Sequence, residues 1–297
     1  MSMLSTIQQL LEKQDTKTLT HALIHSSRWL LGERLHYGPL QQRGLMANWL
    51  SIMSHFESIE QCVTLQCGDL DAGVFCLKST SSKTYFVAMF EHSDGAIKQL
   101  LQWVDSTSLA TLFGDETIDA GSMNSTSMDF WPEPDPLQLS EFDPQLHQYT
   151  THAGISDVLY GSVSDPIKTI LTEWWQIWQG FDTAGVASVY AGLSHLSVNS
   201  TVVYKEGDTS SSVASWLTRL EGKLHRRYSQ LELVVADDNS ALVRWRIDAD
   251  IKSVNGLVRV RLPIVTMLTF AQNKIESEYW VIDGLAFEKR FATPLPF

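Results

Sequence analysis

Hydrophobic and charged residues alternate along the last third of the chain with the period of two that is typical of strands with one buried face. Residues 241–251, 257–270 and 274–283 follow this pattern, and 230–235 is a shorter strand candidate before them. The predicted apolar face carries Val243, Trp245, Ile247, Ala249, Val258, Val260, Leu262, Ile264, Leu268, Ile275, Ser277, Tyr279 and Val281. The predicted charged face carries Arg244, Arg246, Asp248, Asp250, Arg259, Arg261, Glu276 and Glu278. The pattern predicts an antiparallel meander that packs on one face.

Three helical patterns precede these strands. Apolar residues recur at helical spacing over 165–181, a short second helix begins at Asp182, and a third covers 210–224 with serines at its start. The basic residues 225–227 are then predicted at the carboxyl end of the third helix, where the helix dipole favours cations. Helices followed by an antiparallel meander predict an α+β domain.

The first part of the chain shows the same order of elements in weaker form. Helical patterns cover 4–13, a short stretch from Asp15 to about Leu23, and a stretch from about Pro39 to Phe56. Strand patterns follow at 61–67, 73–78, 83–91 and 97–105.

Residues recur at a constant separation between these two parts. The differences 182 − 15, 204 − 37 and 216 − 49 all equal 167, and they match Asp15-Thr16 with Asp182-Thr183, Tyr37 with Tyr204, and Ala47-Asn48-Trp49-Leu50 with Ala214-Ser215-Trp216-Leu217. Such a register is typical of tandem copies of one folding unit. The sequence therefore predicts a degenerate first domain at 1–112 and a better-formed second domain at 165–297.

The segment 113–164 between the two domains is predicted to be an acidic linker. It contains nine acidic residues, four prolines and no Lys or Arg. It also contains aromatic residues such as Phe130 and Trp131, which solvated tethers usually lack. We therefore expect part of this segment to lie on one of the repeats, across a pocket, and the acidic linker is also a candidate docking surface for a protein partner.

Charge and composition exclude several classes of function. The formal net charge is −12, and neither repeat has the basic stripe that nucleic acid binding requires, so no nucleic acid partner is expected. No apolar run approaches the ~20 residues that span a bilayer, so no membrane association is expected. The 13 N-terminal residues do not resemble a secretory signal, and the three cysteines suggest neither a disulfide scaffold nor a zinc site. The expected location is the cytoplasm, with the cysteines as small hydrophobic strand residues.

The sequence lacks the spacings that hold common cofactors. The nine histidines show neither HxH nor HExxH spacing, and no glycine-rich phosphate loop, nucleophile elbow or nucleotide fingerprint is present. Neither a metal nor a cofactor is expected.

The second part contains the segments Trp174-Trp175, Phe181-Asp182, Val189-Tyr190-Ala191, Trp216-Leu217 and Asn273-Lys274-Ile275-Glu276. In their order and pattern they resemble the nuclear transport factor 2-like superfamily, particularly its SnoaL-like and ketosteroid-isomerase-like members. The resemblance covers 165–284 and, more faintly, 4–105. It implies a cone-shaped, strongly bent antiparallel sheet packed on three N-terminal helices, with a pocket at the open end. Because many members pair through their sheets, it also implies an intramolecular pseudo-dimer and leaves a homodimer open.

The isomerase branch of that superfamily uses a carboxylate base opposite a tyrosine and a protonated acid. This chain departs from that pattern, because 196–198 and Val265, where the two acids are expected, contain no carboxylate. His195 with Asp283 is instead the candidate catalytic pair, although both residues also fit structural roles at a helix end and a turn. The candidate ligand-binding residues are Tyr190, Tyr204, Trp216, Trp245, Thr266 and Tyr279.

Three functions therefore remain open. The first is a binding protein for a small apolar or aromatic ligand in the cone of the second domain, since six of the ten tryptophans lie there. The second is an isomerase, cyclase or dehydratase that uses His195 and Asp283. The third is a protein-interaction module that docks a partner through the acidic linker.

Overall fold

The computed structural model of the chain describes residues 13, 23–31, 34–37, 54–80, 83–93, 96–113, 154–199, 201–207, 212–253, 256–291 and 293–297. The chain divides into two compact units, Met1–Pro134 and Asp135–Phe297. The helices predicted in the first part of the chain, and most of the acidic linker, lie outside the described residues. Among the described helices, none combines the length and the apolar character needed to cross a bilayer.

Helices α9 (Asp165–Gly180), α10 (Val186–Val189) and α11 (Val213–Lys223) precede the main strands of the second unit. A proline in the first turn of α9 suits a helix start, and Phe181 ends the helix in the left-handed region with a φ of 54°. Ser212 caps α11 by accepting a hydrogen bond from the amide of Ser215. Three helices are therefore present as predicted, but the second begins at Val186 and not at Asp182, whose carboxylate accepts a hydrogen bond from the amide of Ala184. The basic residues 225–227, however, lie in the following strand and not at the end of a helix.

Four long strands form the predicted meander. They are β10 (Leu224–Ala236), β11 (Ser240–Ser253), β12 (Gly256–Ala271) and β13 (Lys274–Val281), and each pairs antiparallel with the next. A hairpin of β8 (His195–Val198) and β9 (Thr201–Lys205) completes the sheet, with β8 parallel to β13. The strand order is β7-β10-β11-β12-β13-β8-β9.

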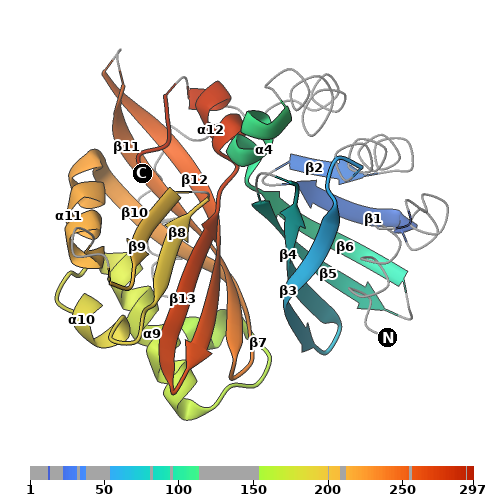
Figure 1. Cartoon of the computed structure of the whole chain (residues 1–297), viewed down its shortest axis with the longest axis horizontal. Helices are drawn as coiled ribbons and strands as arrows, with labels where there is room; N and C mark the ends of the chain where they lie inside the picture. Colours follow the sequence, from blue (N-terminus) through green and yellow to red (C-terminus); the bar gives the residue numbers. More distant parts are fainter. Residues whose placement is uncertain are drawn as a thin grey trace. The chain divides into compact units, whose positions relative to one another are not determined.

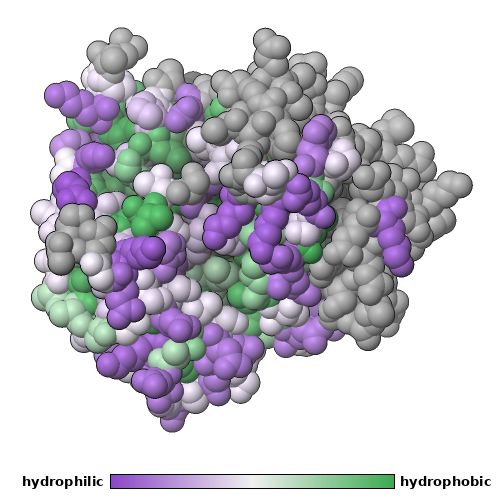
Figure 2. Space-filling view, in the orientation of Figure 1, coloured by the Kyte–Doolittle hydropathy of each residue, from purple (hydrophilic) through white to green (hydrophobic). Residues whose placement is uncertain are grey.

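The large curved sheet of the second unit packs one face against its helices. In Figure 1 the long strands bend, and α9, α10 and α11 lie along one side of them. Buried residues of these helices and of alternate strand positions form one hydrophobic core. Polar and apolar residues are intermixed on the outside of this unit in Figure 2. The α+β class and the curved sheet are as predicted for the second domain.

Three further segments complete the second unit. Helix α8 (Ile155–Val158) and the short strand β7 (Leu159–Tyr160) precede α9, and β7 pairs with β10, so the end of the predicted linker at 113–164 packs on the second unit. After β13, helix α12 (Gly284–Phe291) leads into residues 293–297, of which Leu295 and Phe297 pack against the core. The sequence patterns did not predict α12.

The first unit contains a six-stranded sheet with the order β2-β1-β6-β5-β4-β3. Strands β3 (Ser58–Cys67), β4 (Leu70–Lys78), β5 (Lys83–Ser93) and β6 (Ala96–Val104) form an antiparallel meander at the four predicted positions. Helix α4 (Ser106–Phe113) follows β6. The hairpin of β1 (Leu23–Leu31) and β2 (Arg34–Tyr37) lies beside β6, so Leu23, the last residue of the helix predicted from Asp15, lies in a strand.

The six strands of the first sheet and six of the seven strands of the second, all except β7, follow the same order, and two bulges correspond between them. In each, a hairpin joins the last meander strand through a parallel pairing, β1 with β6 and β8 with β13. The first meander strand has a bulge at Cys62 in the first unit and at Glu232 in the second, since the paired positions on either side skip these residues. An eight-residue helix follows the last strand in both units. This correspondence supports the tandem duplication, which stays a prediction.

Candidate functional site

Glu278 is a fully buried acid on β13, and it faces the helices. A bulge explains this position: Thr269 pairs with Ser277 and Phe270 pairs with Ile275, so Glu276 has no partner in the ladder. The carbonyl of Glu276 instead accepts hydrogen bonds from the amide and hydroxyl of Ser194. The bulge reverses the alternation, so the placement of Glu278 on the charged face was wrong.

Three hydrogen-bond donors surround the carboxyl group of Glu278. The indole Nε1 of Trp280 donates to Oε1 over 2.6 Å, and that of Trp174, from α9, donates to Oε2 over 3.2 Å. The hydroxyl of Tyr190, at the end of α10, also hydrogen-bonds Glu278. Trp178 in turn donates to the Tyr190 hydroxyl over 3.2 Å. Side chains of α9, of the end of α10 and of β13 itself therefore hold the carboxyl group in place.

Burial shifts the acid–base behaviour of this site. Loss of water raises the pKa of Glu278 from the ordinary value of 4.5 to about 7, against the opposing hydrogen bonds from Trp280, Tyr190 and Trp174. Burial also raises the pKa of Tyr190 well above 10, and the charge of Glu278 adds to this effect. Near neutral pH, Glu278 can therefore gain or lose a proton while Tyr190 remains a donor.

Indole rings fill the space around the acid. Trp178 and Trp280 have centroids 4.6 Å apart, and Trp245 lies 5.1 Å from Trp280 and 5.7 Å from Trp178. Trp174 meets Trp245 edge to face at 6.0 Å. The Nε1 of Trp245 donates to the hydroxyl of the buried Thr266 over 2.9 Å. We call Glu278, Tyr190, Thr266 and the indoles of residues 174, 178, 216, 245 and 280 the Glu278 cluster.

Phe297 lies at the edge of the Glu278 cluster. Its ring centroid is 6.2 Å from that of Trp216 and 5.6 Å from that of Trp280. The ring is only partly buried, and the main chain beside it is held by a 2.9 Å hydrogen bond from Lys223 to the carbonyl of Pro296. Phe297 is thus an aromatic group supplied by the chain itself at the border between the indoles and the surface.

The structure brings four of the predicted ligand-binding residues together. Tyr190, Trp216, Trp245 and Thr266 all belong to the Glu278 cluster. Tyr204 packs against the edge of the core from β9. Tyr279 is buried but adjoins Glu278 on the same strand, so its side chain points to the opposite face, outside the cluster.

The strand register places the predicted catalytic residues His195 and Asp283 at different levels of the sheet. The parallel register of β8 and β13 places His195 level with Ser277. Asp283 comes six residues later (283 − 277), beyond the end of β13 at Val281. At about 3.3 Å per residue along a strand, the two residues lie more than about 10 Å apart. This register disfavours the catalytic pairing, which stays a prediction, because a sequence does not reveal the register of a parallel strand.

Sequence reasoning missed Glu278 as the central polar residue. The signal that could have found it is Trp280, an indole two positions away, since alternate residues of a strand share a face. If strand residues alternate between the two faces, Glu278 shares the inward face with Trp280, two positions later. The same alternation started from the buried Ile275 assigns Glu278 to the outward face, because it ignores the bulge.

The corresponding positions of the first unit are apolar. Leu100 follows the bulged residue Lys98 by two positions, as Glu278 follows Glu276. Phe75 and Trp245 also hold matching positions. Phe75 pairs with the residue just before the bulge in β3, and Trp245 pairs with the residue just before the bulge in β10. Leu100 and Phe75 are both buried. The bulged strand of the first unit therefore packs with a leucine two positions after its bulge.

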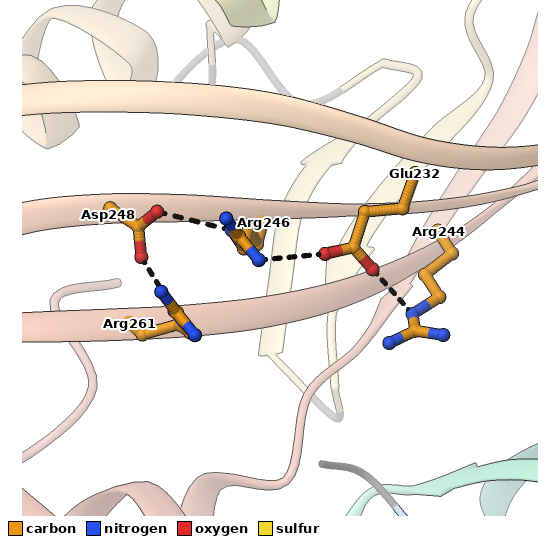
Figure 3. A network of polar contacts seen from close by, with 5 residues as sticks. All are labelled: Glu232, Arg244, Arg246, Asp248 and Arg261. Atoms are coloured by element: carbon orange, nitrogen blue, oxygen red, sulfur yellow. Dashed lines mark hydrogen bonds and ion pairs between the residues drawn. The ribbon is translucent and has the colours of Figure 1, made fainter. Parts of the chain in front are cut away.

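The opposite face of the second sheet carries an ion-pair network, drawn in Figure 3. Glu232 joins Arg244 and Arg246 over 2.6 and 3.3 Å, and Asp248 joins Arg246 and Arg261 over 3.1 and 3.0 Å. Each acid in the network is shared between two arginines. The charged face of β11 and β12 is therefore as predicted, with its carboxylates engaged by neighbours. Groups of three or more metal-binding side chains are absent from the residues that the structure describes.

Comparison with known proteins identifies similar folds only. No family model matches the chain, and no curated protein matches it. Among solved structures, a protein described as a SnoaL-like polyketide cyclase from a Jannaschia species is 16% identical with a TM-score of 0.37, over 46% of this chain and 100% of its own. A steroid delta-isomerase from Pseudomonas aeruginosa is 16% identical with a TM-score of 0.33, over 39% and 87%.

A third similar structure is a hypothetical protein of ketosteroid isomerase-like fold from Catenulispora acidiphila in complex with trimethylamine. It is 12% identical with a TM-score of 0.35, over 42% of this chain and 93% of its own. These neighbours are nuclear transport factor 2-like, ketosteroid isomerase-like and SnoaL-like proteins. All three scores lie below 0.5, so the fold of the second unit rests on its own element order and strand pairing, and the neighbours' functions remain their own.

Proposed function

We propose that the second unit binds a small, largely apolar or aromatic molecule that carries a hydrogen-bond donor or a positive charge, and that Glu278 is its polar anchor. The observation that carries the proposal is a fully buried carboxyl group surrounded by indole rings. Aromatic walls with a few converging polar groups are typical of small-molecule sites. Indole faces also attract organic cations.

Packing alone does not account for the acid. Removing a carboxylate from water costs several kcal/mol, which its partners offset only in part. The raised pKa of Glu278 reflects that cost. Leu100 occupies the matching place in the first unit, so an apolar residue is compatible with the same bulged strand. Because a leucine fits at the matching place, the free-energy cost of burying an acid there suggests that Glu278 has a role beyond folding.

Phe297 is the group that a ligand would displace. It contacts Trp216 and Trp280 and is held by few other described contacts. A planar ring of similar size could take its place against the same indoles. The ligand would then approach the Glu278 cluster from the side on which Phe297 lies.

Tryptophan fluorescence titration with three small probes tests the proposal. Benzylamine offers a cation, benzyl alcohol offers a neutral donor, and toluene offers neither. We expect the first two to bind at least tenfold more tightly than toluene, and Glu278→Leu to remove this difference. Phe297→Ala should tighten binding of all three probes severalfold, because the competing ring is gone.

Two surface variants serve as controls. Glu276→Gln changes an exposed acid on the same strand, and Leu257→Ala removes a side chain that is 55% exposed. Both should bind the probes as the wild type does. The proposal fails if no probe binds saturably to the wild type or to Phe297→Ala, or if Glu278→Leu keeps the preference for benzylamine.

Proton transfer is a second candidate function, and the acid–base behaviour of the site favours it. A carboxyl group with a pKa of about 7 beside a tyrosine donor suits general acid–base catalysis of the isomerase or dehydratase kind. The reacting groups would be Glu278 and Tyr190. The test is exchange of the α-protons of 2-tetralone in deuterated buffer, followed by NMR. A rate that rises through pH 7 and is lost in Glu278→Gln would support catalysis, and an unchanged rate would reject it.

A further inference from the structure

Two cysteines of the first unit lie together on neighbouring strands. Cys62 is the bulged residue of β3, between the pairs Gln61–Phe75 and Val63–Val74. Cys76 on β4 pairs with Glu60, two positions before Cys62. Because Glu60 and Cys62 are exposed whereas Ile59 and Val63 are buried, both point to the face away from the buried positions. Cys76 shares that face with Glu60, which places the two thiols diagonally across the strand pair.

Positive charge surrounds these thiols. Lys78 lies two positions after Cys76, and its Nζ is 2.5 Å from the carboxylate of Glu60. Lys83 lies on β5 with its Nζ 5.7 Å from the ring centre of Tyr85, which pairs with Cys76. Among the residues that the structure describes, the titratable groups near the two cysteines on this face are Glu60, Lys78, Lys83 and Tyr85. Because this face carries two ammonium groups and one carboxylate, its net positive charge favours the thiolate form of a cysteine.

The two thiols act as one titrating pair, while the Cys62 thiol also donates a weak 3.8 Å hydrogen bond to the carbonyl of Glu60. The neighbouring Cys62 thiol, together with Lys83 and Lys78, lowers the pKa of Cys76 to about 7, although burial opposes this shift. The neighbouring Cys76, followed by burial, raises the pKa of Cys62. The first proton therefore leaves the pair near neutral pH, and the second is retained.

We propose that Cys62 and Cys76 form a covalent modification site for small disulfides, at which Cys62 is the sulfur that solvent reaches and Cys76 shares its charge. Cys62 is exposed, whereas Cys76 is buried. Cys62 passes its proton to the Cys76 thiolate, the Cys62 sulfur attacks one sulfur of the small disulfide to form the new sulfur–sulfur bond, and the disulfide's other half leaves as a thiolate. The small disulfide is the oxidant, and the departing thiolate takes up a proton in water. Cys62 thus acts as more than a small hydrophobic strand residue.

The pH dependence of the reaction with 5,5′-dithiobis(2-nitrobenzoate), a chromogenic disulfide, tests the site on the full chain. We expect one fast equivalent whose rate has its midpoint near pH 7, and mass spectrometry should place the adduct on Cys62. Cys62→Ser should remove this equivalent. Cys76→Ser should move the midpoint upward by at least one pH unit, toward the ordinary thiol value of about 8.5. The rate at pH 7 should fall only a few-fold, because a more basic thiolate is also more nucleophilic.

A surface variant tests the same electrostatic effect without altering the buried Cys76. Lys83 is exposed, so Lys83→Gln should fold normally, and it should raise the midpoint by a few tenths of a pH unit. Cys67→Ser alters the third cysteine, at the far end of β3, and should leave the fast equivalent unchanged. The proposal is overturned if Cys62→Ser keeps the fast equivalent, or if folded Cys76→Ser and Lys83→Gln both keep the wild-type midpoint.

Discussion

The indole of Trp280 donates a 2.6 Å hydrogen bond to the carboxyl group of Glu278, two positions earlier on the same strand, and both side chains are fully buried. The acid and one of its donors are therefore fixed by a single strand. Trp174 and Tyr190 then close around them from two helices. Because only a bulge at Glu276 turns this strand face inward, the whole polar centre depends on one irregular residue of the ladder.

Glu278→Leu should change how stability depends on pH. The folded pKa of about 7 lies above the ordinary value of 4.5, so the stability that Glu278 contributes is fully present below about pH 4.5. It is lost as the pH rises through 7. Between pH 5 and pH 8 the wild type should therefore lose about 2–3 kcal/mol of unfolding free energy relative to Glu278→Leu. Urea unfolding at several pH values measures this difference.

Glu276→Gln is the matched control for that experiment. Its side chain is exposed on the same strand, so its stability curve should run parallel to that of the wild type. If the curves of Glu278→Leu and the wild type also run parallel from pH 5 to pH 8, Glu278 does not titrate as inferred.

The outward and inward faces of β11 can be predicted from sequence, because no bulge interrupts its pairing with β12. Trp245 and Ile247 therefore alternate with Arg244 and Arg246 throughout. The inward position of Glu278 cannot be read in the same way. One extra residue in the ladder reverses every later position, and local sequence does not mark which residue will bulge.

The candidate site was predicted in part for a similar reason. Tyr190, Trp216 and Trp245 are large apolar residues of helix and strand faces, so their convergence follows from the core. The relation of His195 to Asp283 depends instead on the register between β8 and β13. Such a register is set by the packing of the whole sheet and leaves no pattern in either segment.

Asp250→Asn should destabilise the second unit in a way that depends on pH. Asp250 is buried and accepts hydrogen bonds from Arg259, while Arg226 lies 2.5 Å away. Arg259 and then Arg226 hold the pKa of Asp250 below its ordinary value of 3.8. Its stabilising contribution is present above about pH 4 and is lost as the pH falls through the lowered folded value. The substitution should cost about 2 kcal/mol at pH 7 and less at pH 3.5.

Urea unfolding at the two pH values measures this cost. Glu288→Gln removes an exposed acid from α12 and should be nearly neutral at both. A cost for Asp250→Asn that stays the same from pH 7 to pH 3.5 would show that the arginines do not favour its charged form.

Asn199→Gly should destabilise the second unit although the backbone suits glycine. Asn199 follows β8 with a φ of 53°, a left-handed conformation that glycine adopts without strain. Its side chain, however, accepts a hydrogen bond from the amide of Ile282 over 2.8 Å and donates to the carbonyl of the same residue over 3.1 Å. Loss of both bonds leaves two buried main-chain groups without these partners, at a cost of about 2–4 kcal/mol.

Asn273→Gly provides a matched comparison within the same unit. Asn273 also has a positive φ, of 58°, but it lies exposed in the turn between β12 and β13. The same exchange there should change the unfolding free energy by less than about 0.5 kcal/mol. If the two variants lose equal stability in thermal and urea unfolding, the hydrogen bonds between Asn199 and Ile282 contribute nothing to the stability of the second unit.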